Sequence, residues 1–229
     1  MPFTAATLTF FRGLARHNAK PWFEAHRADY EQEVVAPMRA LIEEMDVRLA
    51  RFAPEITGHP KRSMFRIYRD VRFSKDKSPY KTNVAASFPW VEGGDSEGPH
   101  GFGESGNPGG YFHLSPGEVY IGGGMWHPPT AKLVSFRKAV VDDPSGVRRL
   151  LEEPEFVSQF GALSGDKLKR VPPGFPPDHP EAELLKHKDF TFGRRLADRD
   201  VMSPGLPEVI AESFEVALPV VRFLARLPG

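Results

Sequence analysis

The chain has 229 residues, in which 30 lysines and arginines balance 30 aspartates and glutamates, and it contains no cysteine. This composition excludes disulfides and thiolate chemistry, and the absence of a basic excess argues against binding nucleic acid or membranes over the whole surface. We find neither a secretion signal nor an apolar run of about 18 residues, so we expect a soluble, cytoplasmic protein that does not bind membranes.

The N-terminal quarter is predicted to be helical. Apolar residues recur at helical spacing over residues 4–51, with an interruption at 18–21. Pro37 lies inside this pattern, and a proline there removes a backbone donor, so we expect a break or a kink.

The middle of the chain changes to a period of two. Alternation predicts a strand over 64–73, and a second strand follows over 83–90. Strands predicted over 111–114 and 118–122 flank a Pro-Gly pair that suits a type II turn, so they should form a hairpin. Successive strands without helical crossovers indicate an antiparallel meander.

Helices return in the C-terminal half. We expect a helix after Pro129 with Thr130 as its cap, and it should end at Asp143. The further elements expected are short helices around 147–151 and 154–160, a short strand over 166–171, a helix over 180–188, an extended segment over 190–196 and a long helix over 207–227. The sequence therefore predicts a single α+β domain over residues 1–229. Its antiparallel sheet of about four to six strands would be packed by N- and C-terminal helices.

Residues 66–81 carry six lysines and arginines around only two aspartates, Asp70 and Asp76. Arginine forks bind phosphate or carboxylate groups through paired hydrogen bonds, and lysines add point charges. This run predicts a site for an anionic small molecule or a nucleotide. The expected ligand-binding residues are Arg66, Arg69, Asp70, Arg72, Ser74, Lys77, Tyr80 and Lys81.

Two other interpretations of this run remain open. The cations could belong to a structural ion-pair network with glutamates of the N-terminal helices, which would suit a scaffolding or interaction protein. Alternatively, they could contact nucleic-acid phosphates while Tyr68 or Phe73 stacks on bases, although neutral overall charge makes this less favoured.

No other motif names a reaction. The triple glycine at 122–124 lacks the spacing of a phosphate-binding loop and favours close backbone packing or a bulge. The histidines show no metal-ligand spacing, so we expect no metal and no cofactor. His113 could sit opposite Tyr120 and, like His127, is a candidate general base, but no catalytic residue is identified.

Four segments together resemble a widespread, mostly bacterial family of uncharacterised proteins: KPWFEAHRADYE, RDVRFSKDKSPYKTN, GGYFHLSPGEVYIGGGMWHPP and HPEAELLKHKDF. The resemblance covers nearly the whole chain. It implies a shared fold and a shared site, but no activity. The implied site residues are Arg69, Asp70, Arg72, Phe73, Ser74, Asp76, Lys77, Pro79, Tyr80 and Lys81. The glycine-rich insert at 95–110 is longer than this connection usually is.

Overall fold

The fold was analysed in a computed structural model, which describes residues 3–91 and 106–229. The helices in these ranges are α1 (Ala5–Arg16), α2 (Lys20–Ala25), α3 (Arg27–Tyr30), α4 (Ala36–Phe52), α5 (Thr130–Asp142), α6 (Pro144–Leu151), α7 (Pro154–Phe160), α8 (Ala182–Leu185) and α9 (Leu206–Arg226). A π-helical segment, η1 (Glu31–Val35), joins α3 to α4, and a 3₁₀ turn, η2 (Asp200–Met202), precedes α9. The strands are β1 (Val84–Pro89), β2 (Gly109–Ser115), β3 (Glu118–Met125) and β4 (Phe190–Leu196).

The N-terminal helices follow the predicted pattern, with the interruption between α1 and α2. A capping box at Thr4 and Thr7 starts α1. The predicted break at Pro37 is wrong, because the chain stays helical through it into α4. The missing N–H of Pro37 leaves the carbonyl of Glu33 without its usual helical donor, and the buried hydroxyl of Thr7 donates to that carbonyl at 2.7 Å.

The four strands form one antiparallel sheet in the order β1-β2-β3-β4, which confirms the predicted α+β meander. Gly117 has φ +78°, as the third residue of a type II turn requires, and it joins β2 to β3. The register places His113 opposite Tyr120, as the sequence predicted.

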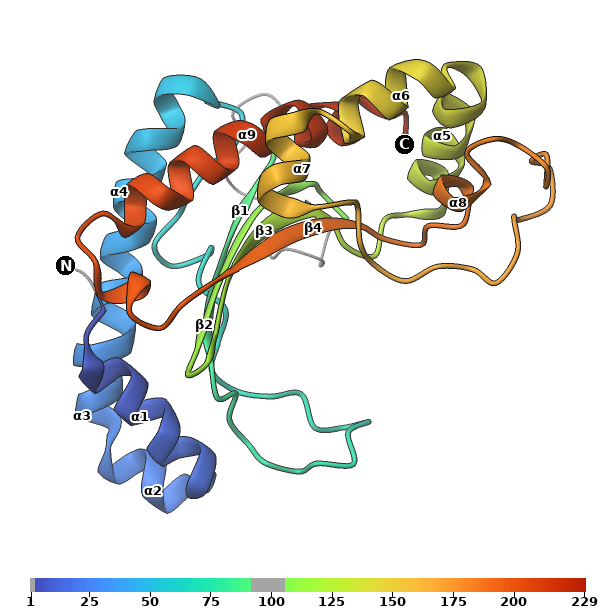
Figure 1. The fold of residues 1–229 in the computed structure, drawn as a ribbon. Coiled ribbons are helices and arrows are strands. Elements are labelled where there is room, and N and C mark those ends of the chain that lie inside the picture. The colour runs from blue at the N-terminus through green and yellow to red at the C-terminus, as the bar shows by residue number, and fades with distance from the viewer. Residues whose placement is uncertain (1–2, 92–105) are drawn as a thin grey trace.

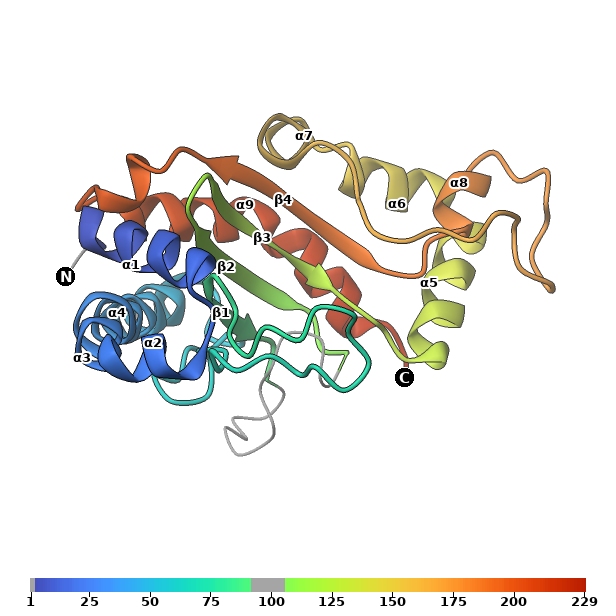
Figure 2. The same ribbon diagram turned by 90° about the horizontal axis from the view of Figure 1, so that it is seen from below.

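The two faces of the sheet have different surroundings. Helix α9 packs against β3 and β2, and α4 lies beside α9 (Figure 1). Phe112, Leu114 and Ile121 are fully buried on this face, where Phe88 also packs its ring against Phe214 of α9. Figure 2 looks onto the sheet from the other side, with α9 behind it. We call this second side the open face.

The strand predicted over 64–73 is wrong. Met64 makes one isolated bridge to Ala86 of β1, and regular pairing does not continue. The backbone N–H of Arg72 instead donates to the carboxylate of Asp70 at 3.1 Å. Such local side-chain bonds compete with strand pairing, because they satisfy the same backbone donors.

Three smaller predictions also differ from the structure. The strand expected over 166–171 is reduced to one bridge between Lys167 and His187. Pro129 occupies the cap position of α5, and Thr130 makes no capping hydrogen bond. The helix expected over 180–188 is confined to α8. Most of the predicted glycine-rich loop, residues 92–105, lies outside the described residues.

Candidate functional site

The cationic run forms a loop, residues 66–81, that projects from the body of the protein (teal in Figure 1). Just before it, Phe65 donates its N–H to the backbone of β1 at 3.0 Å. Inside it, an antiparallel bridge joins Tyr68 to Tyr80. Phe65 and Lys81 therefore lie where the chain leaves the sheet and returns to it. We call this segment the 66–81 loop.

Tyr80 attaches the 66–81 loop to the N-terminal helices. Its ring is buried and stacks on Phe23 of α2, with the ring centres 4.3 Å apart. The side chain of Asn18 bonds both backbone groups of Tyr80: it accepts from the N–H at 3.1 Å and donates to the carbonyl at 2.9 Å. Tyr80 is thus held chiefly as an anchor.

Two arginines of the loop pair with its own aspartates. Arg72 lies 2.7 Å from Asp70, and Arg69 pairs with Asp76. Hydrogen bonds from Arg72 lower the pKa of Asp70 to about 2. The pKa of Asp76 is lowered by hydrogen bonds from Ser78 and Arg69. Both carboxylates are therefore ionised at neutral pH, and they orient the two guanidinium groups.

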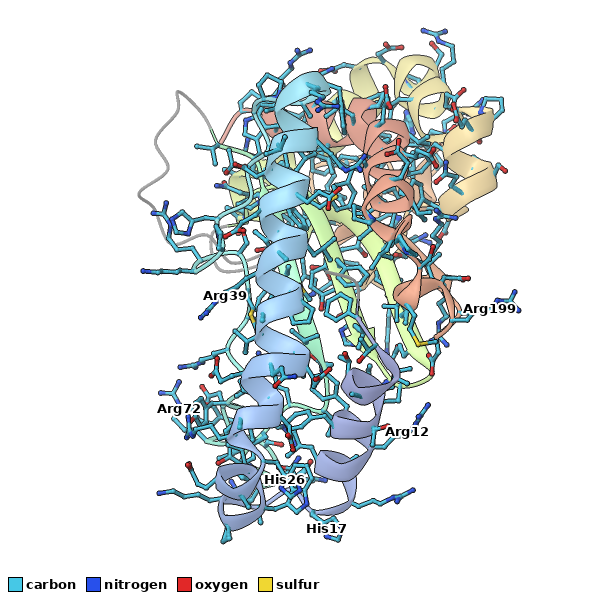
Figure 3. The ribbon with its side chains drawn as sticks, turned by 90° about the vertical axis from the view of Figure 1, so that its left-hand side faces the viewer. Arg12, His17, His26, Arg39, Arg72 and Arg199 are labelled. Carbon is cyan, nitrogen blue, oxygen red and sulfur yellow. The ribbon has the colours of Figure 1, made fainter. Side chains whose placement is uncertain are left out.

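The other loop cations are not balanced in the same way. Lys77 donates to a backbone carbonyl of the loop at 2.8 Å. Arg66 and Lys75 are exposed and form no ion pair with any residue in the described ranges. Three glutamates of the N-terminal helices could have balanced them. Glu24 pairs with Arg27, and neither Glu31 nor Glu33 forms an ion pair within the described ranges. Arg72 itself points outward from the protein (Figure 3), with 76% of its side chain exposed.

A hollow of about 340 Å³, which we call the polar cavity, lies between the end of α1 and the 66–81 loop. Three of the eight predicted ligand-binding residues line it: Arg69, Tyr80 and Lys81. The other five lie elsewhere on the loop: Arg66, Asp70, Arg72, Ser74 and Lys77. The structure therefore divides the predicted set in two.

A second hollow, the sheet cavity, has a volume of about 430 Å³ and lies over the open face. Most of its lining is apolar and includes the rings of Phe65, Tyr111, Tyr120 and Trp126. The polar side chains that line it are Lys81, Asn83, His113 and Thr191. Lys81 and Asn83 line both hollows, so the two cavities adjoin.

Small residues leave room for the sheet cavity. Ala85 pairs with His113 across β1 and β2, and Gly122 pairs with Tyr111. The ring of Tyr120 lies against Gly193 of β4, where an added Cβ would come within 2.1 Å of it. The glycines thus permit close packing, which agrees with the packing interpretation of the triple glycine.

His113 has an unusual environment at the floor of the sheet cavity. Its Nδ1 lies 3.3 Å from the hydroxyl of Tyr111, while its buried Nε2 has no hydrogen-bond partner among the described residues. Burial lowers the pKa of His113, raises the pKa of Tyr111 to about 12 and raises the pKa of Tyr120. All three side chains are therefore uncharged at neutral pH.

Sequence reasoning named His113 but missed Phe65, Tyr111 and Tyr120 as cavity residues. The signal was present in part, since residues 111 and 113 share a face of a strand whose hairpin partner was predicted. What the sequence lacked was the position of β4, which forms part of the cavity from almost 70 residues further along.

The fold and its hollows define the class of protein: an α+β protein whose single antiparallel sheet is covered by helices on one face and carries an aromatic-lined cavity on the other. The chain belongs to the family described as conserved hypothetical protein (DUF2461), whose model matches residues 6–223. This membership confirms the resemblance to a family of uncharacterised proteins. No curated protein and no solved structure matches the chain.

Residues 3–91 and 106–229 contain neither a cluster of metal-ligating side chains nor a helix that could span a membrane. No group of three histidine, aspartate or glutamate side chains lies close enough together to hold a metal ion. In the same ranges, none of the helices combines the length and the apolar character needed to cross a bilayer.

Proposed function

We propose that the protein binds a small organic anion in the sheet cavity, with the charged group of the ligand beside Lys81. The observation that carries this proposal is the position of Lys81, which lines both the apolar sheet cavity and the polar cavity. A ligand there would bury its apolar part over the sheet and keep its charge at a cationic rim.

The size and lining of the sheet cavity suit such a ligand. Small-molecule sites typically occupy about 300–1,000 Å³ and combine apolar walls with a few polar groups that fix orientation. The cavity falls within this range and has this mixture. The ammonium of Lys81 lies 5.4 Å from the ring centre of Phe65, so cation and aromatic wall adjoin.

The remaining loop cations would act at longer range. Arg69 lines the adjoining polar cavity, and Asp76 orients it for an anion there. Arg66, Lys77 and the Asp70-oriented Arg72 would raise the local concentration of anions near the rim. Tyr80 remains a predicted hydrogen-bond donor at the polar cavity, and Ser74 remains one on the loop outside both cavities.

The test is a thermal-shift panel of inorganic phosphate, sugar phosphates, nucleoside monophosphates and carboxylates. A ligand at 100 times its dissociation constant should raise the melting temperature by roughly 5–10 °C. Lys81→Gln should weaken binding by about tenfold to a hundredfold, because a charged hydrogen bond is lost. Lys75→Gln, which removes an exposed loop cation that lines neither cavity, is the matched control. Equal binding by all three proteins would contradict the proposal.

One observation favours a second candidate, the binding of single-stranded nucleic acid. The ring of Phe73 is 94% exposed on the 66–81 loop, and the guanidinium of Arg72 lies 5.8 Å from its centre. Exposed aromatic rings among cations can stack on bases. Phe73→Ser should then weaken oligonucleotide binding by roughly 1–3 kcal/mol, whereas Val47→Ser, at an exposed position on α4, should not. No binding at low salt would exclude this function.

A further inference from the structure

The rim and the floor of the sheet cavity differ in charge. Lys81 lies where the sheet cavity adjoins the polar cavity, and we call that end of the sheet cavity its rim. At the floor lie His113, Tyr111 and Tyr120, whose hydrogen-bonding groups are uncharged. A charged group deep in the cavity would lose its hydration without gaining an opposite charge, so the anionic end of a ligand belongs at the rim. The part that reaches the floor must be neutral.

One buried nitrogen at the floor also lacks a hydrogen-bond partner among the described residues. Nε2 of His113 is buried and has no partner among the residues that the structure describes, and the imidazole that carries it belongs to a residue lining the sheet cavity. A buried polar atom without a partner costs stability, and a ligand that supplies the partner removes that cost. The neutral end of the ligand should therefore carry a hydrogen-bonding atom.

The rings around His113 restrict what can carry that atom. Tyr111 stands edge-on to Phe65 and to Tyr120, with ring centres 6.1 and 6.4 Å apart. Aromatic walls of this kind favour a flat ring over a hydrated sugar or an alkyl chain, because flat rings stack and are weakly hydrated on their faces.

We propose that the ligand is a nucleotide whose base lies in the sheet cavity and bonds Nε2 of His113 through its edge, with its phosphate beside Lys81. This inference rests on the proposed function and names the class of ligand. A base suits either tautomer of His113. If Nδ1 accepts from Tyr111, Nε2 donates to a base acceptor; if Nδ1 donates, Nε2 accepts from a base donor.

Other anions fit less of this arrangement. Inorganic phosphate can meet Lys81 but would leave Nε2 of His113 without a partner and the aromatic walls unfilled. A sugar phosphate could offer Nε2 a hydroxyl but would not stack on the aromatic walls. Aromatic acids without a ring nitrogen, an amino group or a hydroxyl can fill the walls but cannot bond Nε2. A ligand with both a charged end and a heteroaromatic end uses every group.

The test is isothermal titration with the four common nucleoside 5′-monophosphates, ribose 5-phosphate and inorganic phosphate. At least one nucleotide should bind at least tenfold more tightly than ribose 5-phosphate. His113→Phe keeps a flat ring but removes both nitrogens, so it should weaken that nucleotide at least tenfold and leave ribose 5-phosphate unchanged. His17→Phe, at an exposed histidine outside both cavities, should change neither.

A second readout does not depend on the variant folding. In wild-type protein with ¹⁵N-labelled histidine, the nucleotide should shift the Nε2 resonance of His113, and ribose 5-phosphate should not. Equal affinities for nucleotide and ribose 5-phosphate, or an unmoved Nε2 resonance, would overturn the nucleotide inference and leave the proposed anion site standing. Failure of every anion to bind would overturn both.

Discussion

Asn18 connects two parts of the chain that are 62 residues apart in sequence. Its carboxamide copies the hydrogen bonds of a neighbouring strand by donating to the carbonyl of Tyr80 and accepting from its N–H. Tyr80 lies at the base of the 66–81 loop, one residue before Lys81. The orientation of a cation at the rim of the sheet cavity therefore depends on one neutral side chain in the α1–α2 connection.

Asn18→Ala should lower the free energy of unfolding by about 1–3 kcal/mol, because it leaves two partly buried backbone groups without partners. Urea denaturation measures this change. The control is Lys20→Ala, an exposed position two residues away, which should stay within about 0.5 kcal/mol of wild type. A neutral Asn18→Ala would mean that packing of the Tyr80 ring alone holds the loop.

At the scale of elements, the π-helical segment η1 shows how α1 compensates for a proline in α4. Pro37 cannot donate to the carbonyl of Glu33, and the hydroxyl of Thr7 does so instead. Thr7 also accepts from the N–H of Thr4 in the capping box. One side chain thus fixes the start of α1 and its packing against the η1–α4 junction.

Thr7→Val should destabilise the protein by about 1–3 kcal/mol, because the partly buried carbonyl of Glu33 and the N–H of Thr4 lose a partner without a change in side-chain shape. The cost should be smaller in the Pro37→Ala background, where the new N–H can reach Glu33. A double-mutant cycle by chemical denaturation measures this coupling. Additive effects would show that Thr7 and Pro37 act independently.

The sequence predicted best those elements whose conformation depends on residues close together in the chain. The Pro116-Gly117 turn, the helix α7 with its bounds and the long helix α9 were all predicted, whereas α6 begins at Pro144, three residues before the predicted start. The 64–73 strand failed because alternation indicates only a half-buried extended chain, whereas pairing requires a partner with free backbone groups. Pro79 lacks an N–H, and Asp70 captures the N–H of Arg72.

The candidate site was predictable only in part for a related reason. Charge density in one short segment drew attention to Arg69, Tyr80 and Lys81, which line the polar cavity. The sheet cavity is assembled by register among strands that are far apart in sequence, and by small lining residues such as Ala85 and Gly123 that leave space. An empty volume between strands cannot be recognised from a single sequence.

At the scale of the whole molecule, the buried His187 and the partly buried His113 link stability to pH. Burial lowers the pKa of both His113 and His187, and Nδ1 of His187 also lies 3.0 Å from the carbonyl of Asp189. The unfolded chain therefore takes up protons that the folded chain does not. The stability that the two uncharged histidines contribute is fully present above the ordinary histidine pKa of about 6.5. It is lost as the pH falls below that value.

We expect the free energy of unfolding to fall between pH 7 and pH 5.5, with a limiting slope of about 1.4 kcal/mol per pH unit for each histidine. Urea denaturation at a series of pH values measures the slope. His187→Gln should flatten it, whereas His17→Gln, at an exposed position, should not. The carboxylates with lowered pKa, such as Asp70 and Glu183, act in a separate window below about pH 4.5. A flat profile from pH 7 to 5.5 would contradict this prediction.

The central claim is that the sheet cavity on the open face is where the protein binds an organic anion. The most direct measurement is the dissociation constant of the best anion from the panel for wild type and for Ala85→Leu, in which added carbon atoms fill the cavity beside His113. We expect that Ala85→Leu stays folded, as judged by its circular dichroism spectrum, and binds the anion at least tenfold more weakly than wild type. An unchanged dissociation constant in the folded variant would place the ligand elsewhere and contradict the claim.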